Sequence, residues 1–171
     1  MRHVGGRLKD RSVAHERVAA ALDWKTQRRD FEPDGSLRDI YVRDTTVDDW
    51  KVVIALILDG NYQARLVRSG AVVPVPDDFD TLFEADDRHL LSFSIAEVIL
   101  DCHFFETAAI EFSFAPNDVT EARLQSLLAF MVDIGEAMRK PVNMTPENCP
   151  DETIFRYEPD ERQLSWNPPK V

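Results

Sequence analysis

Three side chains with reactive groups stand next to one another at Asp101, Cys102 and His103, in the segment LDCHFFETAAIEFSF. Two more carboxylates, Glu106 and Glu111, follow in the same segment. An imidazole oriented by a carboxylate can act as a general base, a thiolate is a nucleophile, and carboxylates together with an imidazole can ligate a metal ion. Which chemistry the segment supports depends on the secondary structure that positions these groups.

The surrounding pattern predicts three consecutive strands, at residues 90–96, 98–105 and 109–115. Successive residues of a strand point to opposite faces, so we expect Cys102 in the core and Asp101 and His103 on the other face. Burial among aromatic side chains would raise the pKa of the thiol, which argues against a nucleophilic cysteine. The short loop before residue 109 predicts the register in which His103 lies opposite Glu111 and Asp101 lies opposite Ser113.

The first of these strands adds two serines to the same face. A tight turn at 97–98 would place Ser94 beside Asp101 and Ser92 beside His103. The expected polar face then carries Ser92, Ser94, Asp101, His103, Glu111 and Ser113.

Two interpretations of this polar face remain open. In the first, His103 lies between Asp101 and Glu111 as a general base, and a serine hydroxyl completes a small hydrolase-like site. In the second, the face is the solvent side of an antiparallel sheet, and His103–Glu111 is a cross-strand pair that contributes ~0.2–1 kcal/mol. The sequence favours the second interpretation, because it has no nucleophile elbow and no glycine-rich oxyanion-hole segment.

Motifs for metals and cofactors are also missing from the sequence. It contains no HxH or HExxH spacing, no glycine-rich phosphate loop and no dinucleotide-binding fingerprint. We therefore expect neither a metal ion nor a cofactor.

An acidic segment, DDFDTLFEADD, precedes the first of the three strands. It lacks the alternating acidic ligands, the central glycine and the terminal glutamate of a calcium-binding EF-hand loop. We expect a short helix with a solvated acidic surface, where a basic protein partner could dock because clustered carboxylates steer association. The candidate partner-binding residues in this segment are Asp77, Asp78, Asp80, Glu84, Asp86 and Asp87. Ser92, Ser94, His103 and Glu111 of the polar face complete the candidate partner-binding set.

Charge is unevenly distributed along the 171 residues, whose formal net charge is −11. Residues 1–30 hold eight Lys/Arg and four Asp/Glu, whereas residues 31–171 hold twelve Lys/Arg and twenty-seven Asp/Glu. Affinity for nucleic acid comes mainly from Lys and Arg that neutralise phosphates, so we expect no nucleic-acid binding by the acidic part of the chain.

The two cysteines, Cys102 and Cys149, are too few for a disulfide framework, which favours a reducing, cytoplasmic location. The longest uninterrupted apolar run is Val52 to Leu58. A bilayer-spanning helix needs ~18–20 apolar residues, so we expect no association with membranes.

Two regions differ in composition. Residues 1–36 form a basic N-terminal arm that is either a marginal helix or disordered, because its apolar stripe rests mostly on alanine. Residues 37–171 form a single acidic α+β domain, a mostly antiparallel sheet with two amphipathic helices packed on one face. The expected order is strand, helix, two strands, a short helix, three strands, the longest helix and a closing hairpin.

These features predict a non-enzymatic, cytoplasmic protein-binding module. One concrete version is an immunity-type or antitoxin-type inhibitor that masks a basic partner, since the chain is small, acidic and without a catalytic motif. Two alternatives stay open: the hydrolase-like enzyme centred on His103, Asp101 and Glu111, and a structural subunit that forms homo-oligomers through an exposed Phe105 or an edge strand.

Overall fold

Alternating apolar and polar residues produce the strands at the centre of the molecule. In the strand His89–Ile95 every second residue is buried, and the same alternation continues through Val98–His103 and Ala109–Phe114.

The computed structural model describes residues 6–84 and 88–167, with side chains from residue 13 onward. The α-helices are α1 (Gly6–Ala21), α2 (Trp24–Gln27), α3 (Val47–Asp59) and α4 (Glu121–Met138), and the 3-10 helices are η1 (Arg28–Phe31), η2 (Phe79–Phe83) and η3 (Pro116–Asp118). The strands are β1 (Arg38–Arg43), β2 (Arg65–Arg68), β3 (Ala71–Val73), β4 (His89–Ile95), β5 (Val98–His103), β6 (Ala109–Phe114), β7 (Val142–Pro146), β8 (Phe155–Glu158) and β9 (Gln163–Trp166).

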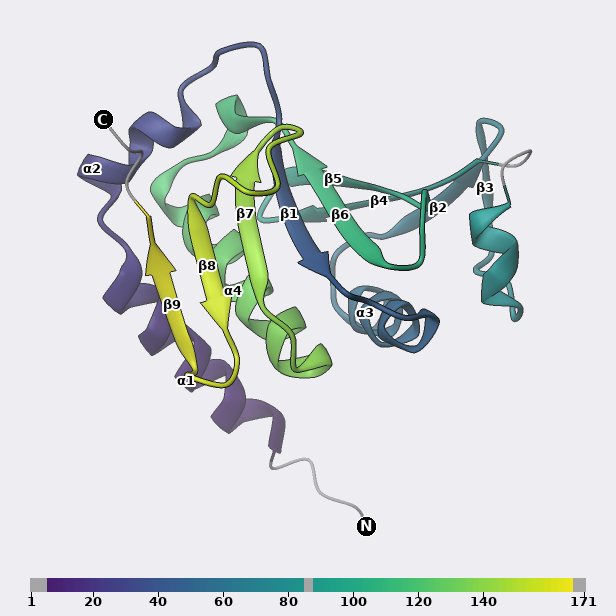
Figure 1. Ribbon diagram of the computed structural model, residues 1–171, viewed down its shortest axis with the longest axis horizontal. Coiled ribbons are helices and arrows are strands. Elements are labelled where there is room, and N and C mark those ends of the chain that lie inside the picture. Colours follow the sequence, from purple (N-terminus) through teal and green to yellow (C-terminus); the bar gives the residue numbers. More distant parts are fainter. Residues whose placement is uncertain (1–5, 85–87, 168–171) are drawn as a thin grey trace.

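All strands of the described residues join one antiparallel sheet of nine strands, in the order β3-β2-β4-β5-β6-β1-β7-β8-β9. The α+β class with a mostly antiparallel sheet is therefore confirmed. β1 lies in the middle of the sheet, between β6 and β7, although it is the first strand of the chain (Figure 1).

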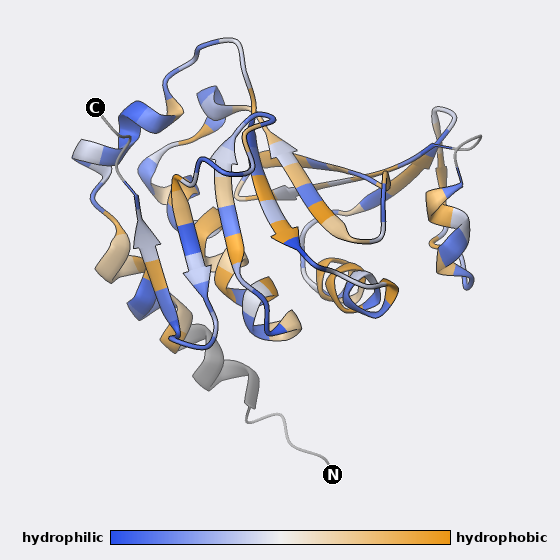
Figure 2. Cartoon of the chain, in the orientation of Figure 1, coloured by the Kyte–Doolittle hydropathy of each residue, from blue (hydrophilic) through white to orange (hydrophobic). Residues whose placement is uncertain are grey.

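The helices cover one face of the sheet (Figure 1), and the strands show alternating apolar and polar residues (Figure 2). The apolar stripes of both amphipathic helices are buried against the sheet. They consist of Trp50, Val53, Ile54 and Ile57 on α3, and Leu124, Leu127, Leu128, Met131, Ile134 and Met138 on α4.

The opposite face of the sheet, called the outer face below, has no helix layer over β1 and β7 in the described part of the chain (Figure 1). Its residues follow from the strand register and from the burial of their neighbours. They include Asp39, Tyr41, Arg65, Ser92, Ser94, Ile99, Asp101, His103, Glu111, Ser113, Asn143, Thr145 and Arg156.

Side-chain caps begin the two long helices of the domain. The Thr46 hydroxyl accepts from the backbone N–H of Asp49, and the Asp49 carboxylate accepts from the backbone N–H of Thr46. The two residues therefore form the capping box for which the segment TVDD has the right spacing. The N-cap of α4 is Thr120, although Asp118 with Glu121 three residues later also has the spacing of a capping box. Asp118 instead closes the 3-10 turn η3 that Pro116 begins.

The N-terminal segment packs against the domain. Its helix α1 lies along α4 and β9, and Val18 is fully buried. Arg17 donates to the Tyr157 hydroxyl at 2.9 Å, and Tyr157 donates a short hydrogen bond to Glu136 of α4. One hydrogen-bond network therefore joins α1, α4 and β8. It holds α1 in place where the apolar stripe of this helix is thin.

One strand, β7, is absent from the expected order, which passes directly from the longest helix to the closing hairpin. Val142 and Met144 are fully buried on the helical face, and β7 pairs with both β1 and β8. Gly135 of α4 makes this packing possible, because a Cβ at that position would lie 2.6 Å from the Tyr157 ring.

Both edges of the sheet are protected against pairing with another chain. Helix α1 packs along β9 at one edge. At the other edge, β3 has only three residues, and Pro74 and Pro76 follow it. Short edge strands and prolines are the usual devices that prevent edge-to-edge association. Among residues 6–84 and 88–167, no helix has the length and apolar character required to cross a bilayer.

Candidate functional site

The register of the sheet assembles a polar row across the outer face. Asp101 lies opposite Ser113, as expected, and this register sets His103 next to Glu111. On the far side of β6, Glu111 lies opposite Tyr41, and Tyr41 lies opposite Asn143. The expected polar face therefore continues onto β1 and β7.

The pairing of β4 with β5 differs from the expected register by two residues. Ser92 lies beside Asp101, Ser94 lies beside Ile99, and His103 lies beside Leu90. The turn between these strands uses residues 96–97, both with positive φ, one position earlier than expected. A shift of two residues keeps every side chain on its face, so both serines remain on the outer face.

Asp39 is the most buried carboxylate of the outer face, with no exposed surface. Its Oδ1 accepts from the Ser113 hydroxyl at 2.8 Å, and its Oδ2 accepts from the backbone N–H of Asn148 at 3.0 Å. Burial raises the pKa of Asp39 above its usual range, although both hydrogen bonds lower it. Asp39 thus fastens the loop after β7 to the centre of the sheet, and it is too deep for direct contact with a partner.

Glu111 and Tyr41 form the central hydrogen bond of the outer face. The Tyr41 hydroxyl donates to Glu111 Oε2 at 2.6 Å, and the pKa of Tyr41 is raised by burial and by this carboxylate. One carboxylate oxygen of Glu111 therefore accepts a hydrogen bond from β1, on the side away from His103. His103 stacks on Phe105, with ring centroids 5.1 Å apart, and has no hydrogen bond to Asp101 or Glu111 within the described residues.

Carboxylates at the centre of the outer face lack ion-pair partners. Arg43 pairs with Asp151 at 3.0 Å, and Arg156 pairs with Glu158 at 2.8 Å. Within the described chain, no Lys or Arg forms an ion pair with Asp101 or Glu111, and both are partly exposed. The centre of this face therefore projects uncompensated negative charge.

Exposed apolar residues flank these carboxylates on β5 and just beyond it. Ile99 is 59% exposed and Phe105 is 67% exposed. Asp101 and His103 lie between them, so a polar pair is flanked by one apolar side chain at each end. Protein interfaces typically combine apolar contact residues with a surrounding rim of polar ones.

The acidic segment lies away from the outer face. Its 3-10 helix η2 packs through Leu82 into the core, and Phe83 contacts Trp50 of α3, on the helical side of the sheet. Asp77, Asp78, Asp80 and Glu84 are exposed in this region, whereas Asp86 and Asp87 lie outside the described residues. The structure therefore does not bring the two halves of the sequence-based partner site together.

Cys102 has no exposed surface, and burial raises the pKa of its thiol, which confirms the expected core position. In the parts of the chain that the structure describes, no cluster of three or more His, Cys, Asp or Glu side chains could hold a metal ion.

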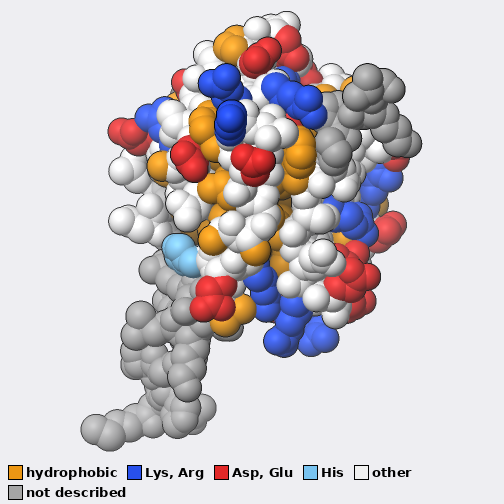
Figure 3. Space-filling view, turned by 90° about the vertical axis from the view of Figure 1, so that its left-hand side faces the viewer, with side chains coloured by type: hydrophobic (Ala, Val, Ile, Leu, Met, Phe, Trp, Pro, Cys, Tyr) orange, Lys and Arg blue, Asp and Glu red, His pale blue; other side chains and the backbone are white. Residues whose placement is uncertain are grey.

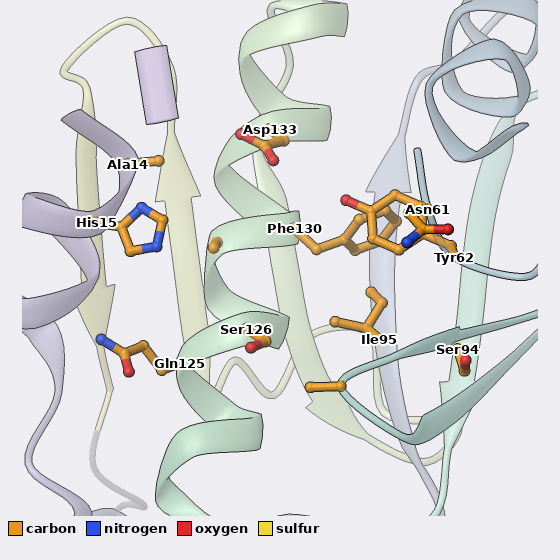
Figure 4. A pocket seen from close by; sticks show the side chains of 12 residues that line it. Ala14, His15, Asn61, Tyr62, Ser94, Ile95, Gln125, Ser126, Phe130 and Asp133 are labelled. Atoms are coloured by element: carbon orange, nitrogen blue, oxygen red, sulfur yellow. The ribbon is translucent and has the colours of Figure 1, made fainter. Parts of the chain in front are cut away.

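Two further hollows lie elsewhere on the molecule. One, of about 310 Å³, lies among α1, α4 and the turn after β4, with His15 from α1 and Asp133 from α4 on its walls (Figure 4). The other, of about 960 Å³, lies between the 29–38 segment and the 146–154 segment.

On the side formed by α1, α2 and β9, basic and acidic side chains are interspersed (Figure 3). That view shows no continuous patch of one sign.

Sequence reasoning missed Asp39, Tyr41 and Thr145 as parts of this face. Alternation within RDIYVR would place Asp39 and Tyr41 on one side of a strand, but it cannot tell which strands lie beside β1. The Thr145 hydroxyl is buried without a hydrogen-bond partner within the described residues, directly across from Asp39.

The pH dependence of stability should reveal the burial of Asp39. Its folded pKa is raised, so its contribution to stability is complete below the unfolded value near ~4 and is lost as the pH rises through the folded value. Asp39→Asn carries no charge at any pH and can still bond Ser113 and Asn148. We expect this variant to gain stability relative to the wild type as the pH rises above about 4, until Asp39 is ionised in the folded protein. Urea unfolding across this range measures the difference, and a difference that stays flat or falls with pH would contradict the assignment.

No family model, curated protein or solved structure matches this chain.

Proposed function

We propose that this protein is a non-enzymatic module that binds a basic protein through the outer face of its sheet. An immunity-type or antitoxin-type inhibitor, which would mask the basic surface of an enzyme, is the concrete version we favour. The free cysteines, Cys102 and Cys149, are compatible with action in the cytoplasm.

The observation that carries this proposal is the pair Asp101 and Glu111 on an uncovered sheet face. Neither has a Lys or Arg within ion-pair distance in the described chain, while Arg43 and Arg156 of the same face are already paired. Uncompensated carboxylates raise the rate at which a cationic surface associates, and they favour it over neutral or acidic surfaces.

Apolar groups at the ends of the same line supply a source of affinity that charge alone lacks. Ile99 and Phe105 are more exposed than most large apolar side chains of the chain, and both flank the carboxylate region. Burial of such groups in a partner supplies most of the binding energy of typical interfaces, with charge setting partner choice and on-rate.

Edge pairing is a weaker candidate for association. The β9 edge lies against α1, and the β3 edge is short and followed by prolines. A homo-oligomer built by strand addition would need a longer free edge.

The hydrolase-like alternative needs His103 oriented by a carboxylate, whereas its ring stacks on Phe105 and Glu111 is bonded to Tyr41.

Capture from a lysate of the source organism, with matched charge variants as bait, tests the proposal. Asp101→Asn/Glu111→Gln removes two charges from the outer face, and Asp77→Asn/Asp80→Asn removes two exposed charges from the η2 region. We expect the wild type to retain a protein of basic isoelectric point at ~50 mM salt and to release much of it at ~300 mM, because screening shortens the reach of surface charge.

The outer-face variant should lose this protein, and the η2 variant should keep it. Equal capture by all three baits, or loss only with the η2 variant, would contradict docking on the outer face.

A further inference from the structure

A hollow of about 340 Å³ opens on the outer face beside Asp101, over β2, β4 and the start of β5. It is lined by Gln63, Arg65, Ser92, Phe93, Ser94 and Ile99. Four of these, Gln63, Arg65, Ser92 and Ser94, carry hydrogen-bond donors on their side chains, and Ile99 adds an apolar wall. The hollow therefore differs in charge from the acidic centre of the same face.

The polar groups of this hollow are unused within the described chain. Arg65 is exposed and forms no ion pair or side-chain hydrogen bond with a described residue. The hydroxyls of Ser92 and Ser94 likewise have no side-chain hydrogen bond there, although the backbone N–H of Ser94 is fixed at 2.8 Å to the Tyr62 carbonyl. A guanidinium and two hydroxyls, held on neighbouring strands, present donors toward one space.

The strand register sets the backbone separation between Arg65 and Asp101. Arg65 lies opposite Ser92, and Ser92 lies opposite Asp101. Neighbouring strands are ~4.8 Å apart, so the backbones of Arg65 and Asp101 are separated by about 10 Å. Arg65 and Asp101 form no ion pair with each other, so this face offers one cationic and one anionic side chain on strands that are two positions apart.

We propose that the Arg65 hollow binds a carboxylate, supplied by an Asp or Glu of the partner protein. The guanidinium fork matches the two oxygens of a carboxylate, and the serine hydroxyls can donate to the same group. This inference deepens the proposed function and rests on it for the source of the carboxylate. It also defines the partner: a surface with a Lys or Arg for Asp101 and, about 10 Å away, an acid for Arg65.

Titration of the full chain with a small carboxylate tests the hollow without the partner. N-acetylglutamate is the probe, N-acetylglutamine is the matched neutral probe, and the Nε resonance of each arginine is followed by NMR. Arg28, which is also exposed and has no side-chain ion pair within the described chain, is the internal control. We expect a Kd at Arg65 about tenfold lower than at Arg28, together with shifts of the Ser92 and Ser94 amides.

Arg65→Gln should abolish those amide shifts, and Arg65→Lys, which keeps the charge but loses the fork, should weaken them. An equal response to the neutral probe, equal affinity at Arg65 and Arg28, or amide shifts that survive Arg65→Gln would each overturn the carboxylate site. Failure of the proposed function has a separate signature, because capture by the Asp101 and Glu111 variants involves no carboxylate probe.

Discussion

Replacing Asp101 and Glu111 together by lysine should lower the association rate constant for the captured basic partner by ~100-fold at low salt. Both carboxylates lie on the uncovered outer face without ion-pair partners in the described chain. Steering by surface charge accelerates association by ~10- to 1000-fold, and reversing the sign converts that attraction into repulsion. The effect should shrink as salt is added, because the screening length falls to about 8 Å near physiological ionic strength.

The matched control is Asp77→Lys/Asp80→Lys, which changes net charge by the same amount on the η2 segment. Stopped-flow mixing of each variant with the partner measures the rate constant. We expect the control to slow association only modestly, since its charges lie on the helical side. Equal slowing by both variants would show that total charge, and not the outer face, controls association.

Glu111→Lys also removes the acceptor for the Tyr41 hydroxyl, so a second variant separates charge from folding. Asp101→Lys/Glu111→Gln keeps an oxygen acceptor at position 111. It should retain the thermal midpoint of the wild type more closely and still associate slowly.

Trp50→Ala should lower the free energy of unfolding by ~3–5 kcal/mol, the largest stability effect we expect from a single substitution. Trp50 is 1% exposed, and its ring lies 5.2 Å from Phe83 and 5.1 Å from Phe104. Its Nε1 donates to the Thr107 carbonyl at 3.1 Å. Truncation leaves a cavity among aromatic rings and removes one of the bonds that hold the loop after β5.

Val52→Ala on the same helix is the control, because Val52 is 41% exposed. Its effect should stay within about 0.5 kcal/mol. Urea unfolding followed by fluorescence of the remaining tryptophans, or by circular dichroism, gives both values. A loss below about 1 kcal/mol for Trp50→Ala would contradict the packing of α3 against η2 and the β5–β6 loop.

Local patterns predicted the parts of this fold that form from neighbouring residues. The Thr46–Asp49 cap, the buried stripe of α4 and the hairpin in which Leu66 lies opposite Val73 all follow from short-range spacing. Each depends on residues close in sequence, so periodicity and turn chemistry determine it.

The pairing of strands that are far apart in the chain could not be predicted from the sequence pattern. β1 lies between β6 and β7, and Tyr41 bonds Glu111 across a separation of 70 residues. Nothing in the spacing of either strand specifies this neighbour, so the sequence alone predicts a polar face of three strands with Glu111 opposite His103. β7 has no counterpart in the expected order of elements, since its short sequence lies between Pro141 and Pro146, and proline is typical of turns and loops.

The error in the β4–β5 register has a local cause. Ala96 and Glu97 both adopt positive φ. Glycine or asparagine usually marks such a turn in a sequence, and neither is present here. Ser92 and Ser94 kept their face because the error was an even number of residues. The assignment of polar residues to the outer face was therefore more secure than the assignment of any pair.

Photocrosslinking from one residue on each side of the sheet tests the central claim most directly. A benzophenone side chain replaces Ile99, which is 59% exposed on the outer face, or Leu58 of α3, which is 47% exposed on the helical side. Irradiation in the presence of the captured basic partner should give a covalent complex from position 99 and none from position 58. A complex from position 58, with none from position 99, would contradict docking on the outer face.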